Sequence, residues 1–383
     1  MITKLNLSNF KCFQALDINF GKLNLLTGIN SSGKSSIIQS ILLVKQNFLK
    51  LNQLTKGYEI FKKFSTEEKK KVFISLLKDF DTSGEYVKIT RPSNLLNENA
   101  NSDEIKIRLE FDNDGFIDLE VNCKEGANKL FGENVSVKNI ENFLKDDNFS
   151  YLSTEHISPR SSYEFSRDDI LRNNIGTMGE FTVHYLAEQK NKDIDIPNLK
   201  HSGSHSTQIH ENIEKWMSNI TKDIVILAES NEYTHNSILR YSYGGKIFWP
   251  QDIGYGVTHA LPIVTLLLKS KVGDIVIIEN PETHLHPAAQ VELASLCALA
   301  SANGVQLIIE THSDHFLNAI RVAIKKGVIA STDVKINYFS KKEIDDTVFS
   351  TTEEIIVNED GSIHRWPEGF FDEIDIQLRK LLW

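Results

Sequence analysis

The sequence contains few cysteines and no long apolar run. Its three cysteines, Cys12, Cys123 and Cys297, are far apart and odd in number. They show neither the CxxC spacing of a zinc site nor a disulfide framework. The longest apolar run, residues 260–268, is far shorter than a bilayer span, and the first residues lack the apolar core of a signal peptide. We therefore expect a cytoplasmic protein with no membrane contact.

Basic residues are fewer than acidic residues. The 383 residues include 42 Lys and Arg against 52 Asp and Glu, which gives a net charge of -10. This balance argues against a surface that is basic throughout, so a nucleic-acid contact would need a local patch. The hydrophobic share of 40% and the charged share of 25% are those of an ordinary globular protein. The chain can form one large domain or two smaller ones.

The N-terminal part alternates short strand-like runs with polar or glycine positions. Residues 2–10, 15–20 and 22–28 are rich in β-forming residues, and the last run ends at Gly28. From residue 33 onward, apolar residues recur at three- and four-residue spacing, which predicts an amphipathic helix.

Residues 51–150 mix different patterns. A Lys-rich, helix-like stretch covers residues 65–80, and strand-like runs at residues 105–111 and 116–121 are separated by turn residues. We interpret this part as an inserted α+β arm.

The pattern becomes strand, helix, strand, helix after about residue 220. Residues 223–229, 274–279 and 305–310 are nearly continuous apolar runs, and helices are expected after Gly256, from Pro287 and after the last of these runs. Apolar strands that alternate with helices predict a mostly parallel sheet with helices on both faces.

The sequence GINSSGKS, residues 28–35, fits the phosphate-loop pattern GxxxxGK[ST] between a strand and a helix. Glycines let the backbone N–H groups point at phosphate oxygens, and the helix N-terminus adds partial positive charge. Lys34 is expected to reach the β- and γ-phosphates, and Ser35 to offer its hydroxyl to Mg²⁺. The alternative is a glycine turn without a ligand.

Three further positions suit a nucleotide site. Glu279 ends an apolar strand and is predicted to hold the metal ion, unless it is a plain surface acid. Gly256 and Thr258 start a helix, which is either a second anion site or a simple helix start. His312 follows another strand, where its ring can hydrogen-bond a γ-phosphate.

The order of these motifs resembles the head of ABC-type ATPases. It is closest to the branch that includes RecF, SMC heads and OLD-family nucleases. The segments IIENPETHLHPAAQ, DIGYGVTHALP, ETHSDHFLNAIR and RWPEGFFDEID resemble a bacterial subgroup of stand-alone OLD-like AAA ATPases. The resemblance implies an α/β P-loop NTPase fold of ABC-head type, with a mostly parallel sheet and an N-terminal antiparallel β portion. Its expected parts are an ATPase head over 1–50 and 151–330, the arm over 51–150 and a C-terminal cap over 331–383.

The family resemblance implies that two heads sandwich two ATP molecules with Mg²⁺. Thr258 would then bind the γ-phosphate across a homodimer interface, although the family more often has Ser there. The expected metal-side residues are Ser35 and Glu279. The expected nucleotide-binding residues are Gly28, Asn30, Ser31, Ser32, Gly33, Lys34, Ser35, Ser36, Gly256 and Thr258.

This chain departs from the family at its catalytic acid. Most ABC heads have Asp followed by Glu, whereas this chain has Glu279 followed by Asn280. An amide can position water but cannot accept its proton, and loss of a general base typically costs ~10²- to 10⁴-fold in rate. Either Glu282 acts as the base, or hydrolysis is slow and ATP chiefly controls assembly. The expected catalytic residues are Glu279, Asn280, Glu282 and His312.

Two functions from different classes follow. One is an ATP-gated switch that controls a separate effector, such as a nuclease, in antiphage defence. The other is a DNA-sensing or DNA-repair ATPase, and a nuclease domain of the Toprim type is not expected in this sequence. A remote third reading is a metal-dependent hydrolase that uses His284, His286, His312, His315, Glu310 and Asp314.

Overall fold

The chain folds into two compact units. The computed structural model describes residues 1–54, 65, 68, 71–72, 75, 80–123, 130–145, 147–344 and 347–382. Unit 1 comprises residues 1–21, 27–146 and 337–354, and unit 2 comprises residues 22–26, 147–336 and 355–383. The helix predicted over residues 65–80 lies mostly outside the described residues. The part boundaries predicted from the sequence stay predictions.

Unit 1 is built on a five-stranded antiparallel sheet of order β2-β1-β4-β5-β6. Its strands are β1 (Ile2–Phe10), β2 (Phe13–Asn19), β4 (Glu104–Phe111), β5 (Phe116–Asn122) and β6 (Phe131–Lys138). β4 and β5 confirm the strands predicted within the arm, and β4 pairs directly with β1. Alternate residues of these strands are buried, which leaves one apolar face to be covered.

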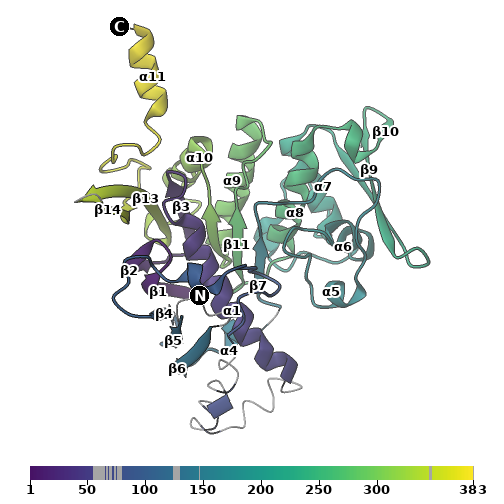
Figure 1. The fold of residues 1–383 in the computed structure, drawn as a ribbon. Helices are drawn as coiled ribbons and strands as arrows, with labels where there is room; N and C mark the ends of the chain where they lie inside the picture. The colour runs from purple at the N-terminus through teal and green to yellow at the C-terminus, as the bar shows by residue number, and fades with distance from the viewer. Residues whose placement is uncertain are drawn as a thin grey trace. The chain divides into compact units, whose positions relative to one another are not determined.

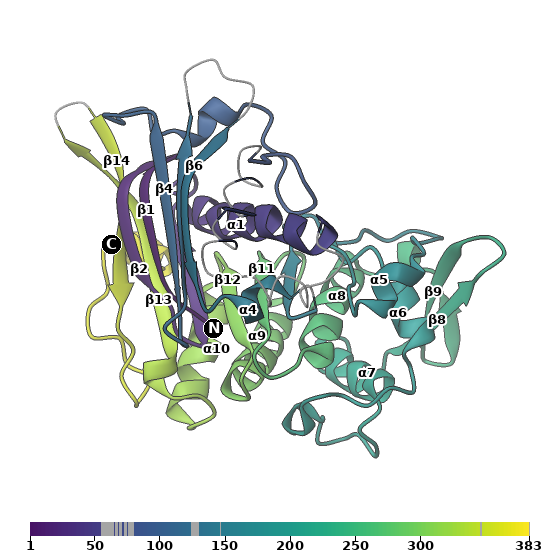
Figure 2. The same cartoon turned by 90° about the horizontal axis from the view of Figure 1, so that it is seen from below.

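The predicted helix after the phosphate loop is confirmed as α1 (Lys34–Leu54). Figure 2 shows it alongside the antiparallel sheet of unit 1. Lys45, although fully buried, donates hydrogen bonds to the carbonyl oxygens of Phe143 and Lys145, both at 2.6 Å. These bonds fasten α1 to the short helix α4 (Glu141–Leu144) and the residue after it.

Unit 2 contains the parallel strands. β7 (Phe149–Leu152), β11 (Ile275–Glu279), β12 (Gln306–Glu310) and the first residues of β3 (Leu23–Gly28) pair in parallel. In this register Glu279 lies opposite Glu310. The strands belong to a six-stranded sheet of order β14-β13-β3-β12-β11-β7, with β13 (Val334–Ile344) and β14 (Thr347–Ile355).

The helices predicted around these strands are present. They are α8 (Tyr255–Lys269), α9 (Pro287–Ala302) and α10 (Asp314–Lys325). α9 and α10 pack against each other (Figure 1). The other described helices are α5 (Arg167–Leu171), α6 (Thr182–Glu188), α7 (Ile209–Ile220), α11 (Glu373–Leu382) and the 3₁₀ turns η1 (Pro92–Leu95), η2 (Pro197–Leu199), η3 (Pro250–Asp252) and η4 (Ser331–Asp333).

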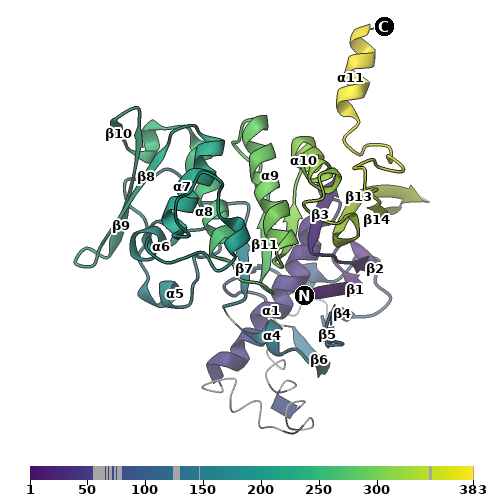
Figure 3. The same ribbon diagram turned by 180° about the vertical axis from the view of Figure 1, so that it is seen from behind.

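One predicted strand of the parallel sheet was wrong. Residues 223–229 fall largely in β8 (Val225–Asn231), which belongs to a separate antiparallel sheet of order β10-β9-β8 with β9 (Asn236–Tyr243) and β10 (Lys246–Phe248). A short hairpin turn joins β8 to β9, and α6 covers this sheet (Figure 3). A short apolar run does not show which sheet it joins. The outer position beside β11 is taken instead by β7, which the sequence pattern did not indicate.

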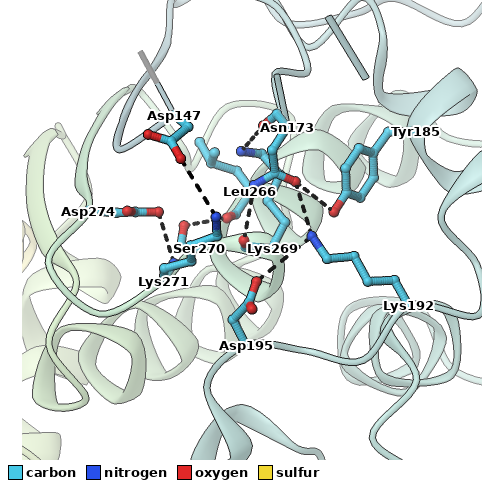
Figure 4. A network of polar contacts seen from close by, with 10 residues as sticks. All are labelled: Asp147, Asn173, Tyr185, Lys192, Asp195, Leu266, Lys269, Ser270, Lys271 and Asp274. Atoms are coloured by element: carbon cyan, nitrogen blue, oxygen red, sulfur yellow. Dashed lines mark hydrogen bonds and ion pairs between the residues drawn. The ribbon is translucent and has the colours of Figure 1, made fainter. Parts of the chain in front are cut away.

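A buried lysine ends α8. Lys269 donates a hydrogen bond to the carbonyl oxygen of Asn173 at 2.7 Å, and Tyr185 donates to the Asn173 side chain at 3.1 Å (Figure 4). Asn173 has a φ of 57°, so this contact holds a left-handed residue against the helix end.

The C-terminal segment packs on the rest of unit 2 through aromatic residues. Phe370 is fully buried, and the guanidinium of Arg321 lies 5.3 Å from the ring centre of Trp366. Within the described parts of the chain, no helix has the length and apolar character to cross a membrane.

Candidate functional site

The phosphate-loop residues form a tight turn in unit 1. Gly28 has a φ of 136° and Gly33 a φ of 109°. A Cβ atom on Gly28 would lie 2.0 Å from the carbonyl oxygen of Phe339, and one on Gly33 would lie 2.4 Å from the Phe13 ring. Both positions therefore require glycine, for conformation and for space. The exposed part of the loop consists of Ile29, Asn30 and Ser31.

The side chain of Lys34 is held in place by carbonyl groups of the loop. The Lys34 ammonium donates hydrogen bonds to the carbonyl oxygens of Gly28 at 3.1 Å and Ile29 at 2.9 Å. The buried hydroxyl of Ser32 donates to the same Ile29 oxygen at 2.7 Å, whereas Ser35 is exposed at the start of α1. A fixed ammonium, an exposed hydroxyl and a helix N-terminus within one turn fit a phosphate group with its Mg²⁺ ion.

Glu279 of unit 2 ends β11 and has two hydroxyl partners. Tyr151 donates to its Oε1 at 3.2 Å, and Thr154 donates to its Oε2 at 2.8 Å. Burial raises the pKa of the Tyr151 hydroxyl, and the nearby Glu279 charge raises it further. Tyr151 therefore remains a hydrogen-bond donor, and the carboxylate is oriented without a cationic side chain among these partners.

Asn280 follows in a left-handed conformation, with a φ of 49°. Its backbone N–H donates to the carbonyl oxygen of Glu310 at 2.8 Å, and its Nδ2 donates to the Thr154 hydroxyl at 3.3 Å. The Oδ1 atom is buried and has no hydrogen-bond partner. Buried acceptors are nearly always paired, so this oxygen suits a water molecule or ligand group.

The structure brings Glu282 and the His312 segment together. Thr311 donates its hydroxyl proton to Glu282 Oε2 at 2.9 Å, and the His312 backbone N–H donates to Oε1 at 2.6 Å. Burial raises the pKa of the Glu282 carboxyl, although these hydrogen bonds act in the opposite direction. The side chain of His312 is exposed.

The start of α8 buries the predicted γ-phosphate residue. Thr258 is fully buried, and its hydroxyl lies 3.2 Å from the Tyr241 hydroxyl. A Cβ atom on Gly256 would lie 2.4 Å from the carbonyl oxygen of His284, so the loop after β11 packs closely on this helix start. The exposed side chain of the first turn is that of Tyr255, at 52%. A γ-phosphate contact by Thr258 stays a prediction, and it requires the hydroxyl to leave Tyr241.

The histidines of unit 2 make ring contacts. His156 stacks on His259 with ring centres 4.1 Å apart, and His284 meets His259 edge-on at 5.7 Å. Burial lowers the pKa of His156 to about 4 and that of His259 to about 3, so both rings are neutral near pH 7. In the described ranges, no group of three His, Cys, Asp or Glu side chains is arranged to hold a metal ion.

Three partners of the predicted residues had not been identified from the sequence. Tyr151 and Thr154 reach Glu279 from β7 and the segment after it, and no motif marks them. Thr311 lies between Glu310 and His312. The strand end that indicates His312 therefore also indicates Thr311.

The chain is similar to known families and proteins over most of its length. Residues 23–318 match the family described as "AAA domain, putative AbiEii toxin, Type IV TA system", and residues 329–381 match a second family, described as a protein of unknown function. The OLD nuclease of Thermus scotoductus is 23% identical over 365 residues, which cover 88% of this chain and 63% of the nuclease. The chain thus spans less than two thirds of that relative.

Solved SMC heads share the fold. The SMC head bound to the C-terminal winged-helix domain of ScpA has a TM-score of 0.51 and 14% identity, over 92% of this chain and 97% of that one. An SMC head with an extended coiled coil, bound to the C-terminal domain of ScpA derived from Pyrococcus furiosus, gives the same TM-score and identity over 100% and 99%. The predicted fold class, a P-loop ATPase of ABC-head type, is confirmed. Since this family model matches residues 23–318, well over half of the chain, the chain belongs to this AAA domain family, and it shares the fold of SMC heads.

Proposed function

We propose that the protein binds ATP with Mg²⁺, hydrolyses it slowly, and dimerises head to head in the ATP-bound state to control a separate effector protein. The observation that carries this proposal is the loop at residues 28–35. Its backbone conformation and close packing require glycine at positions 28 and 33, and hydrogen bonds hold the Lys34 ammonium at the start of α1. Such a loop has a direct use in holding phosphate groups.

The proposed roles follow from each residue's chemistry. Lys34 and the loop N–H groups bind the phosphates, and Ser35 and Glu279 hold Mg²⁺. When bound, the metal ion neutralises charge that develops on the transferred phosphoryl group. Glu279 suits this role because its two oxygens are already oriented by Tyr151 and Thr154.

Slow hydrolysis is proposed because the residue after Glu279 is an amide. Asn280 can accept a hydrogen bond from water through its Oδ1 atom, but it cannot remove the proton. Glu282 is the nearby candidate base, and its raised pKa would favour proton uptake. However, each of its oxygens already accepts a hydrogen bond from the Thr311–His312 segment. We therefore assign Glu282 first to holding His312 in position.

Control of a separate effector, in defence against phage, is the biological role that we favour. The matching family's description names a toxin–antitoxin system, which supports a partnered function. The net charge of -10 supports a protein partner over a broad DNA-binding surface. A DNA-sensing ATPase is the alternative, supported by the name of the OLD nuclease relative.

The test is steady-state ATP turnover of the whole chain, with Lys34→Ala as the blank and particle mass recorded with and without ATP. We expect turnover well below the common enzyme range of about 1 per second and above, together with an ATP-dependent doubling of mass that Lys34→Ala lacks. Turnover within that range would contradict the proposed slow hydrolysis. Stimulation by DNA that weakens steeply with salt would favour the alternative.

A further inference from the structure

We propose that Thr154 is a positioning residue for hydrolysis, because its hydroxyl fixes the direction of the Asn280 amide and so presents Asn280 Oδ1 to the attacking water. This inference rests on the proposed ATPase function and deepens it. Thr154 belongs to none of the sequence motifs described above and lies 126 residues before Asn280 in the chain.

The Thr154 hydroxyl has a single proton to donate. An ionised carboxylate only accepts hydrogen bonds, so the contact of 2.8 Å between Thr154 Oγ1 and Glu279 Oε2 consumes that proton. Towards Asn280 the hydroxyl can therefore act only as an acceptor. The contact of 3.3 Å with Asn280 must be made by the Nδ2 group, which donates. The amide direction thus follows from the donation of the Thr154 proton to Glu279.

The direction of the Asn280 Oδ1 atom is then determined as well. With Nδ2 facing Thr154, Oδ1 points away from it, and this oxygen is buried without a partner. An acceptor that is fixed but unpaired is suited to accept a hydrogen bond from water, and so to orient the lone pairs of the water oxygen. If Thr154 were absent, the amide could turn by half a rotation and offer its donor side to the water instead.

This polarity also explains why an amide occupies position 280. A carboxylate there would place acceptor oxygens against the Thr154 lone pairs, next to the Glu279 charge. The single hydroxyl proton cannot serve two carboxylates at once. An Asn side chain supplies both the donor that Thr154 requires and the acceptor that water requires.

The test compares Thr154→Val, which removes the hydroxyl at nearly constant volume, with Thr154→Ser, which keeps it. We expect Thr154→Val to lower kcat by about tenfold or more, since a hydrogen bond to a charged group is lost, with an ATP Kd within about threefold of the wild type. Thr154→Ser should retain most of the activity. In an Asn280→Ala background, Thr154→Val should lower kcat much less than in the wild type, because the two residues act as a unit.

Thr283→Val is the matched control. Its hydroxyl donates to the backbone carbonyl of Asn280 at 3.0 Å, so it removes a hydroxyl from the same loop without touching the side-chain amide. It should leave kcat near that of the wild type. Full activity of Thr154→Val, or equal losses in the wild-type and Asn280→Ala backgrounds, would overturn the inference.

A measurement without turnover separates this inference from the proposed function. The Asn280 side-chain NH₂ signals can be observed by NMR in protein with isotope-labelled asparagine, and assigned by their loss in Asn280→Ala. We expect Thr154→Val to shift them and Thr154→Ser to leave them nearly in place. If wild-type turnover equals that of Lys34→Ala, the ATPase proposal fails, while these signals still decide whether Thr154 fixes the amide. Unshifted signals in Thr154→Val would reject the inference even in an active ATPase.

Discussion

The carboxylate of Glu282 accepts a hydrogen bond from the backbone N–H of His312 at 2.6 Å, across 30 residues of sequence. Its other oxygen accepts the Thr311 hydroxyl at 2.9 Å. The acid therefore links the loop after β11 to the end of β12. This relationship gives Glu282 a use that differs from proton transfer, because both oxygens are engaged in fixing the segment that carries His312.

Replacement of Glu282 by Gln separates the two uses. A Gln side chain has one acceptor oxygen, so it can accept from either the His312 N–H or the Thr311 hydroxyl, but not from both through that geometry. We expect kcat to fall by about tenfold, with the ATP Kd little changed. The measurement is turnover at saturating ATP, with Thr311→Val as a control that removes only one of the two hydrogen bonds.

The pH dependence of kcat then distinguishes a base from a positioning group. A base with a raised pKa gives a rate that rises with pH through that pKa, and Glu282→Gln would abolish this rise. We expect kcat of Glu282→Gln to follow the same pH dependence as kcat of the wild type, at a lower plateau. Unchanged turnover in Glu282→Gln would remove Glu282 from both roles.

Substitution of Gly28 by Ala should disable the phosphate loop. The new Cβ atom would lie 2.0 Å from the Phe339 carbonyl oxygen, at a φ of 136° that side chains rarely adopt. We expect a loss of more than about 1 kcal/mol in unfolding free energy and no detectable ATP binding. Thermal unfolding and nucleotide titration check both effects.

Gly254→Ala provides the matched control for stability. Gly254 has a φ of -54°, and a Cβ atom there would meet nothing within 4 Å. Its unfolding temperature should stay close to that of the wild type. A tolerated Gly28→Ala substitution would show that the loop can move away from Phe339.

The local part of the site was predictable from the sequence. The phosphate loop, the helix that follows it and the acid at the end of β11 depend on residues that are neighbours in the chain, and strand and helix periodicity indicates them. For the same reason Glu279, Asn280 and His312 were placed correctly at strand ends.

The partners of those residues were not predictable. Thr154 reaches Glu279 across 125 residues, because β7 pairs with β11. β7 is only four residues long, so its pattern gave no signal. Residues 223–229 had the stronger apolar pattern, yet the hairpin to β9 draws β8 into another sheet. The choice between such strands is made by packing across the whole unit, and a single segment does not show it.

The buried pair of Thr258 and Tyr241 should show strong coupling. Their hydroxyl groups lie 3.2 Å apart inside unit 2. Thr258→Val or Tyr241→Phe leaves one buried hydroxyl without its partner, which costs about 1–3 kcal/mol. The double variant removes both polar groups, so we expect it to be more stable than either single variant in thermal unfolding.

The same pair tests the predicted γ-phosphate contact. If Thr258 also reaches ATP, Thr258→Val weakens the ATP-dependent dimer while Tyr241→Phe does not. Equal ATP-dependent dimerisation in the two single variants would mean that the Thr258 hydroxyl has a structural role in the core and does not contact ATP.

The pH dependence of stability should reveal the buried Lys269 at the end of α8 (Figure 4). Burial lowers the pKa of Lys269 to about 8 from the usual 10.5. Between these values the unfolded chain binds more protons than the folded one, so this group makes the unfolding free energy rise with pH. The rise in unfolding free energy is absent below about pH 8 and complete above the usual Lys pKa, and it amounts to roughly 3 kcal/mol at 1.36 kcal/mol per pKa unit. Urea unfolding at pH 7 and pH 10 should show this rise in the wild type.

The variant Lys269→Met should lack this contribution to the unfolding free energy. The variant Lys271→Met, which removes a partly exposed neighbour paired with Asp147 at 3.8 Å, should retain it. An identical pH response in the wild type and Lys269→Met would mean that the Asn173 carbonyl stabilises the ammonium enough to offset its burial.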